Sequence, residues 1–205
     1  MVPGRHVILF AVALGLAGCG GSSNKPVAVV GDQKITQKQL QTTVEHFREE
    51  ARREGRLFPK GDTAAFRRIQ AQLVRLLVYR VELEVAAARI GVHVSDKQVE
   101  RQLAKAGSEA AGARGDKESF LRETARTQLV TEAVFRKVTA GIEVTPAEIR
   151  AYYRAHRRIY GATPYSVVKT AIESQLLSAR KNAAMARWVA GARRSLGPSV
   201  RYELK

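Results

Sequence analysis

Apolar positions along the chain recur mostly every three or four residues, which is the spacing of helices that bury one face. The longest such pattern follows Asp62 and Thr63, either of which can cap a helix, and it meets no breaker before Gly91. At 1.5 Å per residue, this helix would be about 43 Å long. Its broad apolar face must be covered by other segments, and it comprises Phe66, Ile69, Leu73, Leu76, Leu77, Val81, Val85 and Ala88.

Shorter helices are predicted on both sides of this long one. Thr36 with Gln39 and Ser95 with Gln98 are capping boxes, in which each side chain of the pair bonds to the other residue's backbone N–H. The first box starts a helix that runs to about residue 53, and the second starts a short helix through residue 103. The glycines of residues 107–115 make the best hinge candidate in the chain, although an ordinary surface connection is the favoured explanation for them.

Three further helices are predicted in the second half of the chain. Asp116 is expected to cap a helix that ends near Val138, and Thr145 to cap one over residues 147–158, with proline at its first position. Pro164 can start the last long helix. Its predicted inward stripe comprises Val168, Ile172, Leu176, Ala179, Ala183, Met185, Trp188, Val189 and Ala192.

Two short stretches at the ends of this helical region read as strands. Residues 27–30 are a β-branched run followed by a turn, and residues 200–204 alternate as a strand should. A lone terminal strand needs a partner, so we expect the two to pair and the helices between them to form a closed lobe. With 6% aromatic and 26% charged residues, the composition also favours helices. The predicted fold class is mainly α, with a small β element.

Residues 1–18 have the layout of an export signal, with a basic start, an apolar run over 7–16 and small residues before Cys19. The run is about half of the ~20 apolar residues that a transmembrane helix needs. Residues 16–19, Leu-Ala-Gly-Cys, resemble the lipobox of bacterial lipoproteins. This resemblance implies cleavage between Gly18 and Cys19 and a covalent lipid on Cys19, which would anchor the protein to the outer face of the membrane.

Other roles for Cys19 fit the sequence less well. It is the only cysteine, so a disulfide within the chain is impossible. A buried structural thiol is an alternative, but residues 20–26 are small or polar and suit a flexible tether of roughly 15 Å rather than a core. We therefore expect a lipidated tether over 19–26 and one domain over 27–205, with an N-terminal part to residue 140 and a closing helix and strand over 164–205.

The formal net charge of +16 narrows the choice of partners. In a cytosolic protein such an excess would suggest nucleic acid. Export argues against nucleic acid and favours anionic lipid headgroups, acidic wall polymers or acidic stretches of other exported chains.

Four segments, in the same order, resemble parts of the exported foldases of the SurA/PrsA group. Residues 27–36 are similar to their opening strand, turn and helix start, 83–99 to a helix junction, 144–153 to the approach to the parvulin domain, and 172–204 to the helix and strand after it. The lipobox agrees best with the PrsA-like branch. The resemblance implies a helical chaperone lobe that binds unfolded exported polypeptides without ATP.

One departure from that group bears on catalysis. Where its members carry the parvulin isomerase domain, this chain has only residues 154–163. The resemblance therefore implies the chaperone lobe without the isomerase, and residual prolyl isomerase activity remains a less favoured alternative. A cell-envelope interaction lipoprotein without chaperone activity is the second alternative.

The residues themselves show no catalytic constellation. His46, His93 and His156 lie far apart, and none has a metal-ligating partner one helical turn away. We expect no metal and no cofactor other than the lipid on Cys19.

Two clusters are candidate contacts for clients or lipid. The first is a helical run of arginines with adjoining tyrosines, for which the alternative is a solvated helix face with one or both tyrosines buried. The second is a loop pair that could line an exposed apolar groove of at least a few hundred Å². The residues are Arg150, Tyr152, Tyr153, Arg154, Arg157 and Arg158 in the first cluster, and Leu57 and Phe58 in the second.

Overall fold

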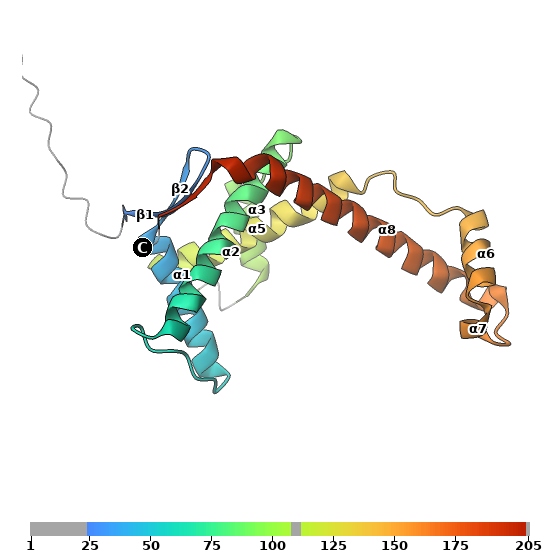
Figure 1. The fold of residues 1–205 in the computed structure, drawn as a ribbon, viewed down its shortest axis with the longest axis horizontal. Helices are drawn as coiled ribbons and strands as arrows, with labels where there is room; N and C mark the ends of the chain where they lie inside the picture. The colour runs from blue at the N-terminus through green and yellow to red at the C-terminus, as the bar shows by residue number, and fades with distance from the viewer. Residues whose placement is uncertain (1–23, 108–111, 204–205) are drawn as a thin grey trace, which may run out of the picture.

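The computed structural model describes residues 24–107 and 112–203, which form a body and an arm joined by one long helix (Figure 1). The elements are β1 (Pro26–Val30), β2 (Gln33–Thr36), α1 (Gln37–Arg53), α2 (Ala64–Arg89), α3 (Asp96–Lys105), α5 (Gly115–Val138), α6 (Pro146–Ala155), α7 (Arg157–Tyr160), α8 (Tyr165–Leu196) and β3 (Val200–Tyr202). The arm contains α6, α7 and the first half of α8. The body contains the other elements and the second half of α8. The predicted mainly α fold class is confirmed.

The sheet joins the two ends of the described chain. Its strand order is β2-β1-β3, with both pairings antiparallel, so that Val30 lies opposite Val200 and Ala28 opposite Tyr202. The Glu203 N–H extends the ladder by donating to the Val27 carbonyl at 2.9 Å. The predicted pairing of the terminal strands is confirmed. β3 ends at Tyr202, two residues before the predicted end of this strand, and Leu204 lies outside the described part.

The first core lies between the sheet, α1 and the first half of α2. Leu40 of α1 and Ile35 of β2 are fully buried there, against Val74 and Leu77 of α2. The capping boxes at Thr36 and Ser95 form as predicted, and the Thr63 side chain caps α2. These local signals set the start of each helix because they satisfy backbone N–H groups that have no partner within the helix.

A second core connects α2 and α5 and is covered by α8. Leu83 and Ala87 of α2 pack with Val130 and Val134 of α5, and Trp188 of α8 covers them. Glu82 is buried at the same junction, with its carboxylate 3.6 Å from the Arg193 guanidinium of α8. In the body, the last part of α8 therefore covers the core between α2 and α5.

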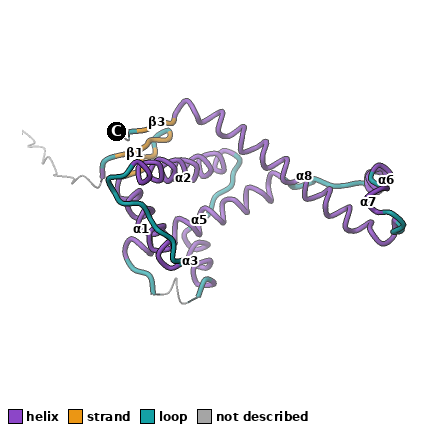
Figure 2. The backbone as a smooth tube through the Cα atoms, turned by 60° about the horizontal axis from the view of Figure 1, so that its bottom comes forward, coloured by secondary structure: helices purple, strands orange, loops and turns teal. Residues whose placement is uncertain are grey.

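The arm does not fold back onto the body, so the expected closed lobe is wrong. α8 has 32 residues, about 48 Å at the helical rise, and carries α6 and α7 at its far end (Figures 1 and 2). Only Ile172 and Leu196 of α8 are buried, and Ala179 and Ala183 of the predicted stripe are exposed. The helix packs at its two ends on separate cores, and so it lacks one continuous buried face.

Two predicted helix starts and ends are also corrected. The helix expected over 147–158 ends at Ala155, because His156 leaves the helical conformation and its ring stacks on Tyr152 at a centroid distance of 3.9 Å. α5 begins at Gly115, so Asp116 lies inside the helix and does not cap it. Asp116 instead pairs with Lys38 of α1 at 3.1 Å.

No helix in the described ranges is both long and apolar enough to cross a bilayer.

The two leucines at positions 40 and 57 give a matched test of the first core. Leu40 is 0% exposed and Leu57 is 100% exposed. Leu40→Ala should lower the free energy of unfolding by about 2–5 kcal/mol through lost burial and a cavity. Leu57→Ala should change it by less than about 0.5 kcal/mol. Chemical denaturation followed by circular dichroism measures both, and equal losses would contradict this placement of the core.

Candidate functional site

The end of the arm is built around three tyrosine rings. We call residues 146–168, which form α6, α7 and the first turn of α8, the tip. The Tyr153 hydroxyl donates to the Thr163 carbonyl at 2.8 Å, and its ring stacks with Tyr160 at 5.4 Å and meets Tyr165 edge-on at 5.5 Å. Tyr153 also packs with Ile149 and Ile172 in a small third core. This aromatic cluster fixes the turns on both sides of α7.

The predicted arginine surface exists, but it is not one helix face. Arg150 and Arg154 come from α6, and Arg157 and Arg158 come from α7 after the break at His156. All four are exposed, and no ion pair to any of them forms within the described ranges. The Arg157 guanidinium lies 4.9 Å from the centre of the Tyr153 ring, and that of Arg150 lies 5.9 Å from Tyr165. The rings therefore hold these two charges in place at the surface.

The two tyrosines predicted as contact residues support the tip from inside. Tyr153 is 8% exposed. Tyr152 is half-buried, and its hydroxyl accepts a hydrogen bond from the Gln175 side chain of α8 at 2.9 Å. One of the two tyrosines, Tyr153, is therefore buried, and the exposed arginines are the part of the cluster left for contacts.

An ion pair holds α6 against α8. The Glu148 carboxylate accepts hydrogen bonds from the Arg180 guanidinium and from the Thr145 N–H, the latter at 2.8 Å, and Arg180 also donates to the Glu143 carbonyl at 2.8 Å. The bond from Arg180 and then those from Thr145 lower the pKa of Glu148 to about 2. The carboxylate therefore stays ionised, and the contact intact, through the neutral range.

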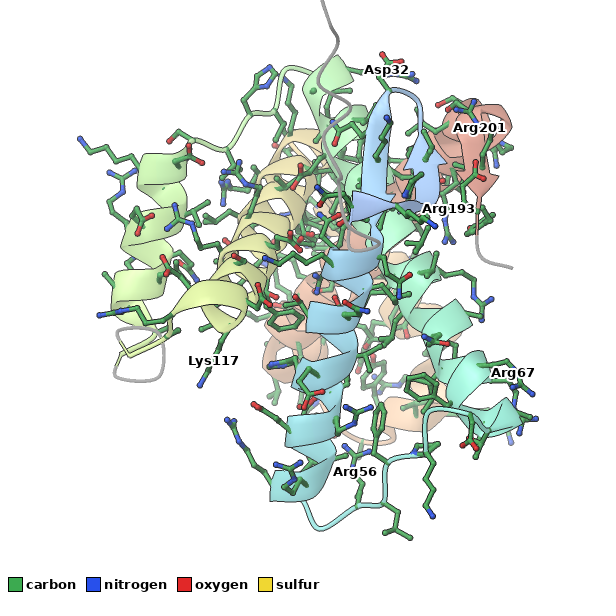
Figure 3. All side chains as sticks on the ribbon, turned by 90° about the vertical axis from the view of Figure 1, so that its left-hand side faces the viewer. Asp32, Arg56, Arg67, Lys117, Arg193 and Arg201 are labelled. Carbon is green, nitrogen blue, oxygen red and sulfur yellow. The ribbon has the colours of Figure 1, made fainter. Side chains whose placement is uncertain are left out.

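The second predicted contact, Leu57 with Phe58, lies in the loop between α1 and α2 at the other end of the molecule. Leu57 is fully exposed and directly follows Arg56, which Figure 3 shows at the lower end of the view. Phe58 is half-buried and packs edge-on against Phe66 at 6.3 Å. Only Leu57 of the pair is therefore free for contacts.

The other large exposed apolar residues are dispersed. Ile159 and Val167 belong to the tip, with 74% and 69% exposure, and Tyr202 lies in β3. Together with Leu57 they occupy three separate places. They do not form the continuous apolar groove predicted from the sequence.

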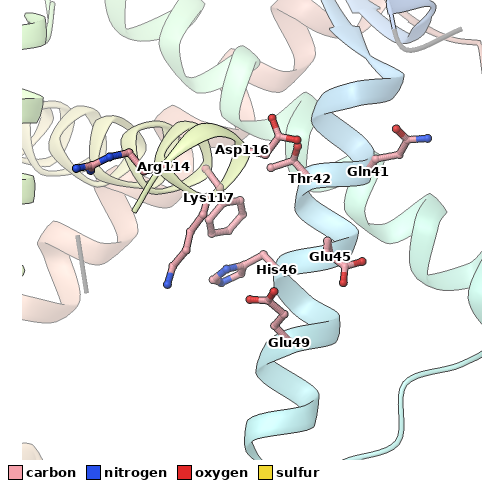
Figure 4. A pocket seen from close by; sticks show the side chains of 9 residues that line it. Gln41, Thr42, Glu45, His46, Glu49, Arg114, Asp116 and Lys117 are labelled. Atoms are coloured by element: carbon pink, nitrogen blue, oxygen red, sulfur yellow. The ribbon is translucent and has the colours of Figure 1, made fainter. Parts of the chain in front are cut away.

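The body has a concave site between α1 and α5, which we call the α1–α5 cleft (Figure 4). Its volume is about 410 Å³. The buried Phe120 ring forms an apolar wall, and the His46 ring stacks on it at 3.9 Å. The rim carries charges of both signs. The cleft is lined by Gln41, Thr42, Glu45, His46, Glu49, Arg114, Asp116, Lys117 and Phe120.

A second cleft of about 430 Å³ lies between α3 and α5. It shares Arg114 with the first cleft, so the start of α5 lies between the two. Its lining also mixes aliphatic and charged side chains, with Leu103 and Ala104 beside Glu118 and Arg122. Sequence reasoning missed both clefts because their residues come from helices far apart in the chain, and each residue taken alone looks like an ordinary amphipathic position.

Partly buried charges between α2 and α5 support the wall of the first cleft. The Arg80 guanidinium lies 3.9 Å from the Glu123 carboxylate and 5.5 Å from the centre of the Phe120 ring. Burial lowers the pKa of Arg80 and raises that of Glu84, which faces the same region. These groups fix the position of α5 relative to α2.

The three histidines considered in the sequence analysis lie in separate places. Within residues 24–107 and 112–203, no three His, Cys, Asp or Glu side chains gather closely enough to hold a metal ion. His46 lies in the α1–α5 cleft, His93 between α2 and α3, and His156 at the end of α6. Gly18 and Cys19, the predicted cleavage and lipidation site, lie outside the described residues.

The pKa of Glu148 gives a test of the contact between arm helices. Arg180→Gln should raise the Glu148 pKa from about 2 toward its ordinary value of 4.5. Because folding lowers this pKa, the contact stabilises the arm above pH 4.5 and is lost as the pH falls toward 2. Carbon-13 NMR titration of the carboxyl measures the shift, with the exposed Arg187→Gln on the same helix as the control. A pKa still near 2 in Arg180→Gln would assign the effect to Thr145 alone.

Comparison with known proteins places this arrangement in a family. A family model described as the SurA-like N-terminal domain matches residues 4–138, which include every described element from β1 to α5. A protein named Chaperone SurA, from Pseudoalteromonas translucida (strain TAC 125), is 27% identical over 123 residues. That match covers 55% of this chain and only 27% of the relative's length. Between α6 and α8, the structure has only α7 and its flanking turns. The chain belongs to the family of SurA-like N-terminal domains.

Proposed function

We propose that this protein is an ATP-independent chaperone that binds unfolded exported polypeptides. The observation that carries the proposal is the SurA-like family match over the body, the part of the molecule that contains both clefts around α5. The dispersed exposed apolar residues are too far apart to form one large binding surface. Client contacts are therefore assigned to the clefts.

The α1–α5 cleft offers what an unfolded segment needs. An unfolded chain presents apolar side chains together with backbone N–H and C=O groups that need partners. The Phe120 ring and the His46 ring provide an apolar surface, while Glu45 and Lys117 provide an acceptor and a donor at the rim. A cleft of about 410 Å³ accommodates only a few side chains, so each contact is weak and the client can leave as it folds.

The mode of attachment is also part of the proposal. We assign residues 1–18 to an export signal and Cys19 to a lipid anchor on the outer face of the bacterial cell membrane, on the basis of the lipobox-like sequence. β1 begins at Pro26, so the tether between lipid and sheet is short. The body would then work close to the membrane from which exported chains emerge.

Two alternatives are less well supported. A prolyl isomerase needs an apolar proline pocket, and the described segment between α6 and α8 contains only the four residues of α7 and its turns. A cell-envelope interaction protein without chaperone activity would bind one folded partner and have no affinity for unfolded chains. The holding assay below separates this alternative from the chaperone.

The lipid anchor predicts a clear effect of Cys19→Ser in cells. The native chain should incorporate labelled fatty acid and sediment with membranes, whereas the variant should lose the label because serine cannot form the thioether. Membrane fractionation with mass spectrometry of the mature N-terminus measures both properties. Label retained by Cys19→Ser would rule out lipidation at this thiol.

A holding assay tests the chaperone and its site together. The chain from Gly20 to Lys205, which contains every described element, is mixed with a chemically unfolded client while light scattering is followed on dilution. Near-stoichiometric suppression without nucleotide, persisting at moderate salt, is expected. Thr42→Trp should fill the α1–α5 cleft and weaken suppression several-fold, whereas Thr170→Trp on exposed α8 should not. No suppression by the native chain would favour the envelope-interaction alternative, and equal activity of both variants would remove the cleft from the proposal.

A further inference from the structure

We propose that the tip of the arm is a membrane-docking surface, in which the four arginines contact anionic lipid headgroups and Ile159 and Val167 enter the interface beneath them. The inference concerns surfaces that the proposed chaperone site does not use. It is independent of whether the protein binds unfolded clients.

The tip carries an excess of positive charge. Residues 146–168 contain Arg150, Arg154, Arg157 and Arg158 but only one acidic residue, Glu148. Arg180 of α8 already pairs with Glu148. The nearest acidic residues along the chain, Glu143 and Glu173, lie outside the tip on either side of it. The tip therefore presents positive charge that no described side chain neutralises, which is the complement of an anionic lipid surface.

The arginines are held in place by the fold. Stacking of Arg157 on Tyr153 and of Arg150 on Tyr165 fixes two of the guanidiniums against the aromatic cluster. Ordering these side chains in the free protein reduces the entropy lost when they meet headgroup phosphates. Arginine also suits this role because its planar group bonds a phosphate with two N–H donors.

Exposed aliphatic side chains accompany this charge. Ile159 directly follows the Arg157–Arg158 pair, and Val167 lies in the first turn of α8, with 74% and 69% of their surface accessible. Aliphatic residues among basic ones are typical of elements that lie in the headgroup region of a bilayer. Single exposed apolar residues are common, so the argument depends on their position among the unpaired arginines.

The shape of the tip favours a membrane over an acidic polypeptide. The clefts described above are lined by body residues, whereas the tip is a projecting end of the molecule (Figures 1 and 2). Peptides often bind in grooves or along strand edges, and residues 146–168 contain helices and turns but no strand, whereas a projecting end of the molecule can contact a bilayer surface. β1 and the tip lie at opposite ends of the long axis (Figure 1). With a lipid near β1, tip docking would lay the molecule along the membrane.

Vesicle binding with matched pairs of arginines tests the charge. The chain from Gly20 to Lys205 is floated with vesicles of phosphatidylcholine, with or without phosphatidylglycerol. R157Q/R158Q should lower partitioning into the anionic vesicles by about tenfold. The control R67Q/R68Q removes the same charge from an exposed arginine pair near the start of α2 and should change it by less than about twofold. Equal losses for both pairs would show diffuse charge attraction and overturn the proposal.

A second pair of variants tests the apolar contact. Ile159→Ser should weaken binding and make it more sensitive to salt, whereas Leu57→Ser, which removes an even more exposed aliphatic group from the loop between α1 and α2, should not. If Ile159→Ser binds the vesicles as tightly as the native chain does, the proposal that Ile159 enters the lipid interface is wrong. Circular dichroism melting confirms that each variant is folded. Poly-glutamate serves as a soluble competitor: if it binds through the same arginines while anionic vesicles do not, the partner is an acidic polypeptide and the membrane proposal is wrong.

Discussion

The pairing of β3 with β1 is the constraint on which the architecture depends. β1 is the central strand of the sheet, with β2 on one edge and β3 on the other, and all of its residues from Val27 to Val30 are buried. Because only the short 3-10 turn Gly197–Ser199 separates α8 from β3, the end of α8 is fixed beside the first strand of the domain. The rest of α8 must then extend outward, and α6 and α7, which precede it, are carried to its far end. The pairing of β1 with β3 at one end of the molecule therefore determines how far the arm extends at the other end.

Local signals in the sequence predicted most elements. The capping boxes at Thr36, Ser95 and Thr145 set helix starts that agree with the structure, because a side chain that bonds the first-turn backbone acts within four residues. The pairing of the terminal strands was also predictable, since an isolated strand is not stable. The order of these elements led to the resemblance to the SurA/PrsA group, and the match of the SurA-like N-terminal domain to residues 4–138 supports that resemblance.

The sequence-based predictions failed where contacts between residues far apart in the chain determine the structure. Arg150 and Arg157 have the spacing of one helix face, but α6 ends between them, where Tyr153 packs edge-on against Tyr165 of α8. The α1–α5 cleft could not be predicted, because His46 and Phe120 meet only when α5 packs against α1. The apolar stripe of α8 is broken for a similar reason, since its two ends belong to different cores. In each case the sequence shows the propensity of a segment and not the partner that it meets.

The arm shows how a very small lobe stays folded. Its core has three buried residues, Ile149, Tyr153 and Ile172, which is too little apolar burial to order two short helices and their turns without further contacts. Stacked tyrosine rings and the Glu148–Arg180 ion pair supply those contacts, and both arise from polar or amphipathic residues. Because these contacts use ring faces and a carboxylate, they leave the arginines and the Ile159 side chain at the surface. The same side-chain chemistry that stabilises the tip therefore also determines what it presents to a partner.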